Sequence, residues 1–297
     1  MSRRVLVTGS EGFTGKYVCA EFAQAGWEVW GAGVAAQSVQ PKYLQIDLLR
    51  PETLTQICEV ARPDVVIHLA AIAFVAESDP TLFYQVNLMG TRHLLAALSH
   101  AKHPPECTIL ASSANVYGNT HLTVLSEESR VNPENDYAVS KLSMEYMAKT
   151  FSTNLHINIV RPFNYTGLGQ NNRFLIPKLV SHFRAKASVI ELGNIDVERD
   201  FSDVRDIARY YYLLGEKRSN VDCINFCSGL SSSLKDCLRL CSELTGHEME
   251  VKINSDLVRN NEVKTLRGDT TRLRSELQVK PPLPLKETLR WMLSEGI

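Results

Sequence analysis

A strand, a glycine-rich turn and a helix follow one another at the start of the chain. Val5-Leu6-Val7 is a short apolar run typical of a buried strand, and residues 16–25 have a helical pattern. The turn between them reads Thr8-Gly9-Ser10-Glu11-Gly12-Phe13-Thr14-Gly15. In such a turn the first glycine allows the tight bend, the second lets the backbone approach a pyrophosphate, and the third lets the helix pack against the strand. This arrangement predicts a dinucleotide phosphate site, although its spacing is Gly-x-x-Gly-x-x-Gly rather than the common Gly-x-Gly-x-x-Gly.

The rest of the first half alternates apolar runs with helical segments. We predict further strands at 27–30, 43–46, 65–69, 107–110 and 157–160, and helices at 51–61, 87–100 and 137–150. Nearly continuous apolar strands with helices between them indicate a parallel sheet covered on both faces. The predicted fold class is therefore α/β, a Rossmann-type doubly wound parallel sheet. His68, inside one of these strands, is interpreted as a packed residue rather than a catalyst.

Composition excludes several classes of function. The 297 residues carry a net charge of −1, and no block of like charge suggests a nucleic-acid or membrane partner. No apolar run approaches the roughly 18 residues of a membrane helix. Strand and turn follow Met1-Ser2-Arg3-Arg4 at once, without a signal-peptide pattern, so we expect a cytoplasmic protein. The seven cysteines form no Cys-x-x-Cys pair, which favours reduced, mostly buried thiols and no metal site.

A phenol and an ammonium lie four residues apart in the stretch Tyr137-Ala138-Val139-Ser140-Lys141. On a helix both side chains share one face. The nearby cation is expected to pull the tyrosine pKa down from about 10 and to make the phenol a proton donor or acceptor at a sugar or alcohol oxygen. Alone, this spacing occurs by chance on many amphipathic helices. The glycine-rich turn at the N-terminus supports the catalytic interpretation.

The two motifs together resemble the short-chain dehydrogenase/reductase superfamily, in its extended, sugar-nucleotide-modifying branch, the NAD-dependent epimerase/dehydratase family. The resemblance covers essentially the whole chain. It implies a dinucleotide-binding domain at 1–162 and a smaller C-terminal α/β substrate-binding domain at 163–297, with part of about 200–230 packing back on the first. The resemblance assigns the cofactor to Gly9, Gly12, Phe13, Thr14, Gly15, Asp47, Leu48, Leu69, Ala70, Ala71, Tyr137, Lys141, Pro162 and Phe163.

The choice of dinucleotide depends on the end of the second predicted strand. An acid there usually binds the adenosine ribose of NAD. Residues 31–36 read Gly-Ala-Gly-Val-Ala-Ala and contain neither a carboxylate nor an arginine. We therefore favour NADPH, with NADH possible. Asp47 on its own could equally be a turn or helix-start carboxylate.

The segment Ala111-Ser112-Ser113-Ala114-Asn115 stands at the end of the fifth predicted strand, where ligands bind in open parallel sheets. The resemblance implies that Ser113 bonds the substrate carbonyl oxygen, Tyr137 donates the proton, and Lys141 lowers its pKa and holds the nicotinamide ribose. The 4,6-dehydratases of the family place acids directly after that serine. Ala114 and Asn115 cannot act as acids or bases near neutral pH, which argues against elimination of water. Carbonyl reduction and C4 epimerisation remain open.

The second half resembles GDP-4-keto-6-deoxy-D-mannose reductases and GDP-mannose 4,6-dehydratases. The similar segments are 164–170, 174–178, 192–201 and 267–269. The resemblance implies that Asn164, Lys178 and Arg199 hold the diphosphate side, and that Arg259 and Glu262 hold phosphate and ribose hydroxyls. Residues 277–281 depart from the family's Gly-Trp-x-Pro, so the last helix is expected to dock differently. The predicted substrate-binding residues are Ser113, Asn115, Asn164, Lys178, Leu192, Gly193, Arg199, Arg259 and Glu262.

These observations predict an NAD(P)H-dependent 4-reductase of a nucleotide-diphosphate 4-keto-6-deoxy sugar. The expected reaction converts GDP-4-keto-6-deoxy-D-mannose to GDP-D-rhamnose, for activated deoxysugars of cell-surface polysaccharides such as lipopolysaccharide. One alternative is a nucleotide-sugar 4-epimerase with tightly bound NAD. Another is a non-catalytic NADP-binding sensor, although a sensor does not need Ser113, Tyr137 and Lys141 together. The resemblance also implies a homodimer formed through helices near 87–100 and 137–150.

Overall fold

A seven-stranded parallel sheet forms the larger body of the protein. The computed structural model describes residues 2–74, 79–258 and 264–295. The strand order is β10-β6-β5-β4-β1-β2-β3, and every neighbouring pair is parallel. The strands are β1 (Arg4–Thr8), β2 (Glu28–Gly33), β3 (Tyr43–Gln45), β4 (Val65–His68), β5 (Cys107–Ala111), β6 (Ile157–Pro162) and β10 (Cys223–Phe226). The predicted doubly wound fold is confirmed.

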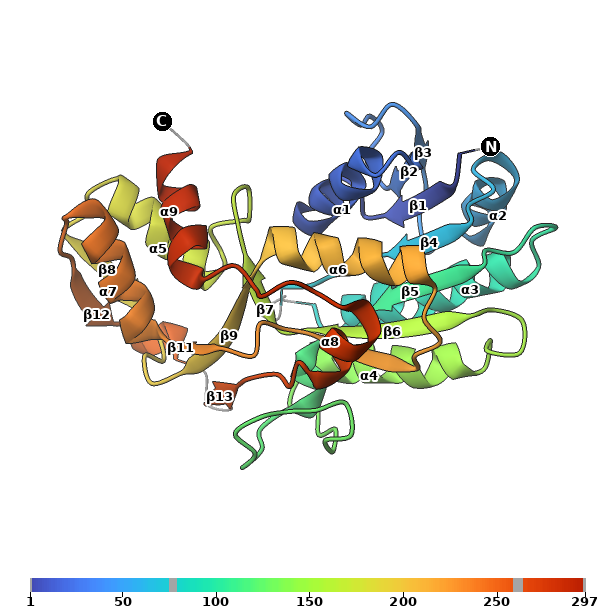
Figure 1. Ribbon diagram of the computed structural model, residues 1–297. Coiled ribbons are helices and arrows are strands. Elements are labelled where there is room, and N and C mark those ends of the chain that lie inside the picture. The colour runs from blue at the N-terminus through green and yellow to red at the C-terminus, as the bar shows by residue number, and fades with distance from the viewer. Residues whose placement is uncertain (1, 75–78, 259–263, 296–297) are drawn as a thin grey trace.

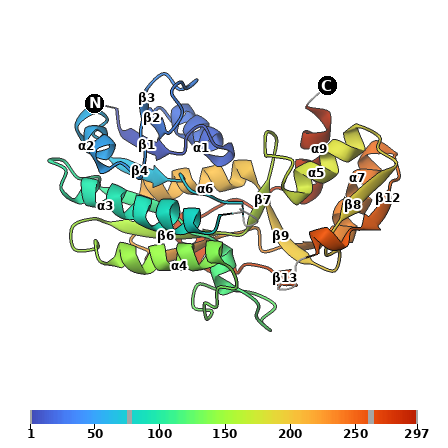
Figure 2. The same cartoon turned by 180° about the vertical axis from the view of Figure 1, so that it is seen from behind.

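Helices cover both faces of this sheet. One face packs against α1 (Phe13–Gln24), α6 (Val204–Lys217) and α8 (Thr271–Leu277), which lie in front in Figure 1. The other packs against α2 (Pro51–Val60), α3 (Thr91–Ser99) and α4 (Asp136–Lys149), and Figure 2 shows α3 and α4 from that side. Because side chains alternate along a strand, Val5 and Val7 enter the first core while Leu6 enters the second. Full burial of both faces explains the continuous apolar strands.

Three elements differ from the sequence prediction. Helix α1 begins at Phe13 rather than at residue 16, because Gly12 already takes the extended conformation of an N-cap. The helix predicted at 87–100 begins earlier, as a π-helical segment η1 (Phe83–Gly90) that runs into α3. Strand β10 was not among the predicted strands. It follows α6 and pairs with β6, so residues beyond 200 complete the sheet.

A smaller body carries the later part of the chain, coloured yellow to red in Figure 1. Its first sheet contains β7 (Asn164–Thr166), β9 (Glu198–Asp203), β11 (Ser231–Ser233) and β13 (Thr265–Leu266). A second pairs β8 (Val189–Leu192) with β12 (Glu250–Ile253). Helices α5 (Leu175–Arg184), α7 (Leu234–Thr245) and α9 (Leu285–Ser294) pack with these strands around one hydrophobic core. The chain also has two short 3₁₀ turns among its described residues: η2 (Ala114–Tyr117) follows β5 in the larger body, and η3 (Ser255–Leu257) follows β12.

Other features of the described residues bear on function. The seven cysteines are free thiols, six of them buried and Cys223 half-buried. Among the residues described, no helix has the length and apolar character to cross a bilayer. Within the same part of the chain, no cluster of three or more His, Cys, Asp or Glu side chains is arranged to hold a metal ion.

Candidate active site

A cavity of about 740 Å³ opens where the carboxyl ends of the central strands meet the smaller body. It brings together residues from the glycine-rich turn, from the ends of β4, β5 and β6, and from α4, β7, α5, β8 and β9. The predicted site residues that line it are Gly9, Gly12, Phe13, Thr14, Gly15, Leu69, Ala71, Ser113, Asn115, Tyr137, Lys141, Pro162, Phe163, Asn164, Lys178, Leu192, Gly193 and Arg199. Residues that are remote in sequence therefore share one site.

The glycine-rich turn has the geometry that a pyrophosphate needs. Gly9 has a φ of +71°, and a Cβ there would lie 2.8 Å from the Ala70 nitrogen. A Cβ at Gly15 would lie 2.2 Å from the Gly9 carbonyl oxygen. The N-cap of α1 is Gly12, which has no side chain to cap the first amides, and the first turn of α1 has no acidic residue. The exposed amides and the helix dipole favour an anion at this point, so the residues present fit a dinucleotide.

Ser113 is oriented by its neighbour. The serine is the N-cap of η2, and its Oγ accepts hydrogen bonds from the backbone nitrogen and the Nδ2 of Asn115, both at 3.2 Å. The lone pairs of Oγ are thereby occupied, so Ser113 acts as a donor through its own proton, toward Tyr137 in this structure and toward a carbonyl oxygen of a substrate. Asn115 lines the cavity, but its contact in this structure orients Ser113.

The pKa of Tyr137 does not follow the sequence prediction. Burial raises it to about 12, against a smaller opposing effect of a hydrogen bond with Ser113. The expected depression of this pKa by Lys141 is therefore wrong, since desolvation of the phenolate dominates. Tyr137 packs edge-on against Phe83 of η1, with ring centroids 5.8 Å apart. At neutral pH the phenol carries its proton and can donate it to a substrate oxygen.

Lys141 is buried beside Tyr137, and its Nζ donates to the Ala111 carbonyl oxygen at 2.7 Å. Burial lowers its pKa from 10.5 to about 8, and Glu145 opposes the shift. His68, buried in β4, bonds Thr8 and Thr91 through its two ring nitrogens. Burial lowers the pKa of His68 to about 3, so this histidine is a neutral packed residue, as predicted.

The opposite wall of the cavity carries cations from the smaller body. Lys178 of α5 donates from Nζ to the Glu191 carbonyl oxygen at 2.6 Å. Arg199 of β9 is buried and donates from Nη1 to the carbonyl oxygens of Glu198 and Lys264. Asn164 begins β7, which pairs with β9, and so it lies on the same wall. Two positive charges facing a cavity this large suit a diphosphate.

Among the described residues, three predicted site residues do not line this cavity. Leu48 is buried in the core beneath α2 and α3, and Ala70 lies against Gly9. Asp47 accepts from the Leu49 amide at 2.9 Å, which fits the alternative of a turn carboxylate. Arg259 and Glu262 lie outside the described residues, so their roles stay predictions.

Several aromatic residues of the cavity were missed by the sequence analysis. Tyr165 bonds Thr14 through its hydroxyl at 2.8 Å and stacks on Phe13. Phe74 and Phe174 meet edge-on across the cavity, with centroids 5.9 Å apart. Phe174 directly precedes α5 inside a segment already singled out, which was the available signal. Phe74 had none, because its contact depends on the tertiary fold.

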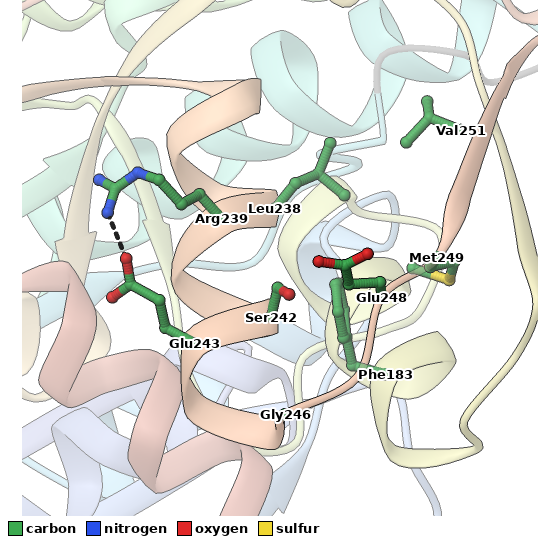
Figure 3. A pocket seen from close by; sticks show the side chains of 9 residues that line it. All are labelled: Phe183, Leu238, Arg239, Ser242, Glu243, Gly246, Glu248, Met249 and Val251. Atoms are coloured by element: carbon green, nitrogen blue, oxygen red, sulfur yellow. Dashed lines mark hydrogen bonds and ion pairs between the residues drawn. The ribbon is translucent and has the colours of Figure 1, made fainter.

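A second hollow, of about 510 Å³, lies in the smaller body between α5, α7 and β12 (Figure 3). Phe183, Leu238, Met249 and Val251 give it an apolar floor. Its charged rim includes Arg239 and Glu243, which pair with each other on α7. The charged side chains that line it, Arg239, Glu243 and Glu248, all lie on the exposed rim.

Comparison with known proteins places the chain among sugar-nucleotide enzymes. A model of the NAD dependent epimerase/dehydratase family matches residues 5–225. GDP-6-deoxy-D-talose 4-dehydrogenase of Aggregatibacter actinomycetemcomitans is 37% identical over 91% of this chain and 90% of its own length. GDP-6-deoxy-D-mannose reductase of Pseudomonas aeruginosa is 33% identical over 99% and 97%. The structure of RMD from Pseudomonas aeruginosa complexed with NADPH superposes with a TM-score of 0.86 and 33% identity, covering 98% of that chain and 99% of this one.

Proposed function

The chain belongs to the NAD dependent epimerase/dehydratase family, and from that premise we propose that it is a 4-reductase of a GDP-4-keto-6-deoxyhexose. The preferred reaction is the reduction of GDP-4-keto-6-deoxy-D-mannose to GDP-D-rhamnose with NADPH, or with NADH. The observation that carries the proposal is the single cavity that holds the glycine-rich turn, the trio Ser113, Tyr137 and Lys141, and the cations Lys178 and Arg199. Relatives acting on GDP-6-deoxy sugars support it.

Each group of residues in the cavity has a separate role in the proposed reduction. The glycine-rich turn and the first turn of α1 would hold a dinucleotide, which would supply the hydride for C4. Ser113 donates a hydrogen bond to the ketone oxygen, because Asn115 occupies its acceptor sites. Tyr137 gives its proton to the same oxygen as negative charge develops there, and Lys141 stabilises the phenolate that remains. Lys178 and Arg199 hold the diphosphate. The substrate domain of this proposal is residues 163–297, apart from α6, β10 and α8, which pack in the larger body.

The protonation state of Tyr137 in this structure suits proton donation to a ketone oxygen at neutral pH. A phenol with a pKa of about 12 arrives protonated, as a reductase requires. Oxidation of an alcohol would need the phenolate first, at a cost of about 1.4 kcal/mol for each unit between the pH and the pKa. The positive charge of an oxidised nicotinamide would lower that cost, so a nucleotide-sugar 4-epimerase with tightly bound NAD is the alternative function.

Absorbance at the NAD(P)H band separates the candidates. Steady oxidation of NADPH with GDP-4-keto-6-deoxy-D-mannose supports the reductase. Cofactor that copurifies and is never consumed, with interconversion of two GDP-sugars, identifies the epimerase. No turnover with any keto-sugar nucleotide of a panel varying in base and sugar leaves only the NADP-binding sensor and contradicts the proposal.

Product stereochemistry is the finer measurement. Reduction of the C4 ketone from one face gives GDP-6-deoxy-D-mannose, which is GDP-D-rhamnose, and from the other face the C4 epimer, GDP-6-deoxy-D-talose. The talose product is supported by the name of the relative that is 37% identical, GDP-6-deoxy-D-talose 4-dehydrogenase. The proton coupling between C3 and C4 of the product distinguishes them, since it is large for two axial protons and small otherwise.

The proposal also includes the oligomeric state and the cellular location of the enzyme. We place the enzyme in the cytoplasm, as a homodimer formed through the exposed sides of α3 and α4. Size-exclusion chromatography with light scattering tests the dimer, and substitution of the exposed Tyr146 on α4 by a charged residue is expected to weaken it.

A further inference from the structure

A buried ion pair lies directly behind the catalytic trio. Glu145 of α4 and Arg161 of β6 are 5% and 7% exposed. The guanidinium donates to both carboxylate oxygens, from Nε to Oε1 at 2.9 Å and from Nη2 to Oε2 at 2.6 Å. Ser112 donates a third hydrogen bond to Oε1 at 2.5 Å. A buried carboxylate with three donors is held firmly in one position.

This carboxylate joins the elements that carry the catalytic groups. Glu145 stands one helical turn after Lys141 and two turns after Tyr137. Ser112 directly precedes Ser113 at the end of β5. Lys141 also bonds β5, through the Ala111 carbonyl oxygen. Consecutive residues of the strand end are therefore held by consecutive turns of α4.

We propose that Glu145 is a positioning residue for the reduction. Its carboxylate fixes Ser112, and through it Ser113, against Tyr137 and Lys141, and it places a negative charge beside the Lys141 ammonium. The inference rests on the proposed function for its catalytic meaning, but its physical content concerns this chain alone.

The charges around Lys141 support this role. Burial by itself drives Lys141 toward the neutral amine, and the charge of Glu145 opposes that effect. Among the groups packed nearby, His68 of β4 is neutral, Tyr137 carries its proton, and Arg161 of β6 is a cation. Glu145 is thus the acid whose charge opposes the effect of burial on Lys141, and the bidentate bond from Arg161 fixes its position.

Glu145→Gln in the full chain with bound dinucleotide tests the role. We expect kcat to fall by about 10²-fold, the loss typical of a small misplacement at a reacting centre. KM for the sugar nucleotide and Kd for the dinucleotide should change no more than about threefold, because substrate and cofactor contact other residues. The alkaline limb of the kcat profile should move to lower pH than wild type, because Lys141 loses its counter-charge.

Asp203→Asn is the matched control. The Asp203 carboxylate is also buried, accepts from Arg205 and Thr288, and lies at the start of α6 outside the cavity. Both variants should lower Tm, but Asp203→Asn should leave the alkaline limb at the wild-type pH. A folded Glu145→Gln enzyme with wild-type kcat and an unmoved limb would overturn the proposal.

Ser112→Ala covers the case in which Glu145→Gln does not fold. It removes the bond to β5 and no charge, so kcat should fall while the alkaline limb stays in place. Wild-type kcat in Ser112→Ala would then overturn the positioning role.

A readout without substrate separates this inference from the proposed function. NMR titration of protein labelled with ¹³C at the lysine ε carbon, with Lys141 assigned by Lys141→Met, reports the Lys141 pKa directly. A lower pKa in Glu145→Gln than in wild type is expected even if no keto sugar is turned over. An equal pKa in both proteins contradicts the electrostatic part of the proposal.

Discussion

The two hollows of the molecule are similar in size and differ in chemistry. The cavity at the strand ends has a volume of about 740 Å³, and the hollow between α5, α7 and β12 about 510 Å³. The first contains Lys141 and Tyr137, both buried and both with shifted pKa values. The second contains Arg239 and Glu243, which are exposed to solvent and lie one turn apart on one helix. Volume alone does not make a reactive site, whereas burial of polar groups from several elements does.

The comparison predicts the largest effect for loss of the proton donor. Tyr137→Phe keeps the ring and its contact with Phe83 but removes the hydroxyl. We expect kcat to fall about 10²- to 10⁴-fold, the value of general acid catalysis. Fluorescence titration should show nearly unchanged binding of the dinucleotide and of the GDP-sugar. Full activity of Tyr137→Phe would show that the strand-end cavity is not the reactive one.

Glycine substitutions in the two regions form a matched pair. In Gly15→Ala the new Cβ would meet the Gly9 carbonyl oxygen at 2.2 Å, so the phosphate turn must shift. We expect dinucleotide affinity to fall about 10- to 100-fold, in line with about 1–3 kcal/mol for overpacking. Gly246 lines the second hollow with a φ of +66° and nothing within 4 Å of an added Cβ. Gly246→Ala should cost about 1–2 kcal/mol of stability from left-handed strain and leave dinucleotide affinity unchanged, as measured by calorimetric titration and denaturant unfolding.

The pH dependence of kcat should reflect the ionisable groups of the strand-end cavity and not those of the second hollow. As pH rises through about 8, Lys141 loses its charge, so kcat should fall, approaching tenfold for each unit. Stability should move in the opposite direction. The unfolded chain binds a proton at Lys141 up to about pH 10.5 and the folded chain only to about 8, so this lysine makes the free energy of unfolding rise between these values. A kcat profile that stays flat from pH 7 to 9 in steady-state assays would contradict the assignment.

The smallest effect is expected at the rim of the second hollow. Solvent screens the exposed Arg239–Glu243 pair, and neither side chain lines the strand-end cavity. Arg239→Ala should leave kcat, KM and the alkaline limb at their wild-type values. A changed pH profile in this variant would show that the two hollows are coupled.

Much of the fold followed from local sequence patterns. Apolar runs of three to five residues with helical segments between them indicated the parallel sheet, and Gly9, Gly12 and Gly15 indicated the phosphate turn. These signals are local because strand and turn geometry depend on neighbouring residues. Strand β10 was missed, because this short segment can be recognised as part of the sheet only from its pairing with β6.

The spacing of Tyr137 and Lys141 by itself determined that both side chains share one face of a helix. Only the tertiary structure decided how they ionise. Packing buries the phenol, so its pKa rises to about 12 where the sequence alone predicted a decrease. Likewise, nothing in the sequence joined Ser112, Glu145 and Arg161, which meet only where β5, α4 and β6 pack together. Residue spacing determines which side chains share a face of one helix or strand. Desolvation and charge pairing instead depend on all the elements that surround a group, and these elements come together only when the whole chain folds.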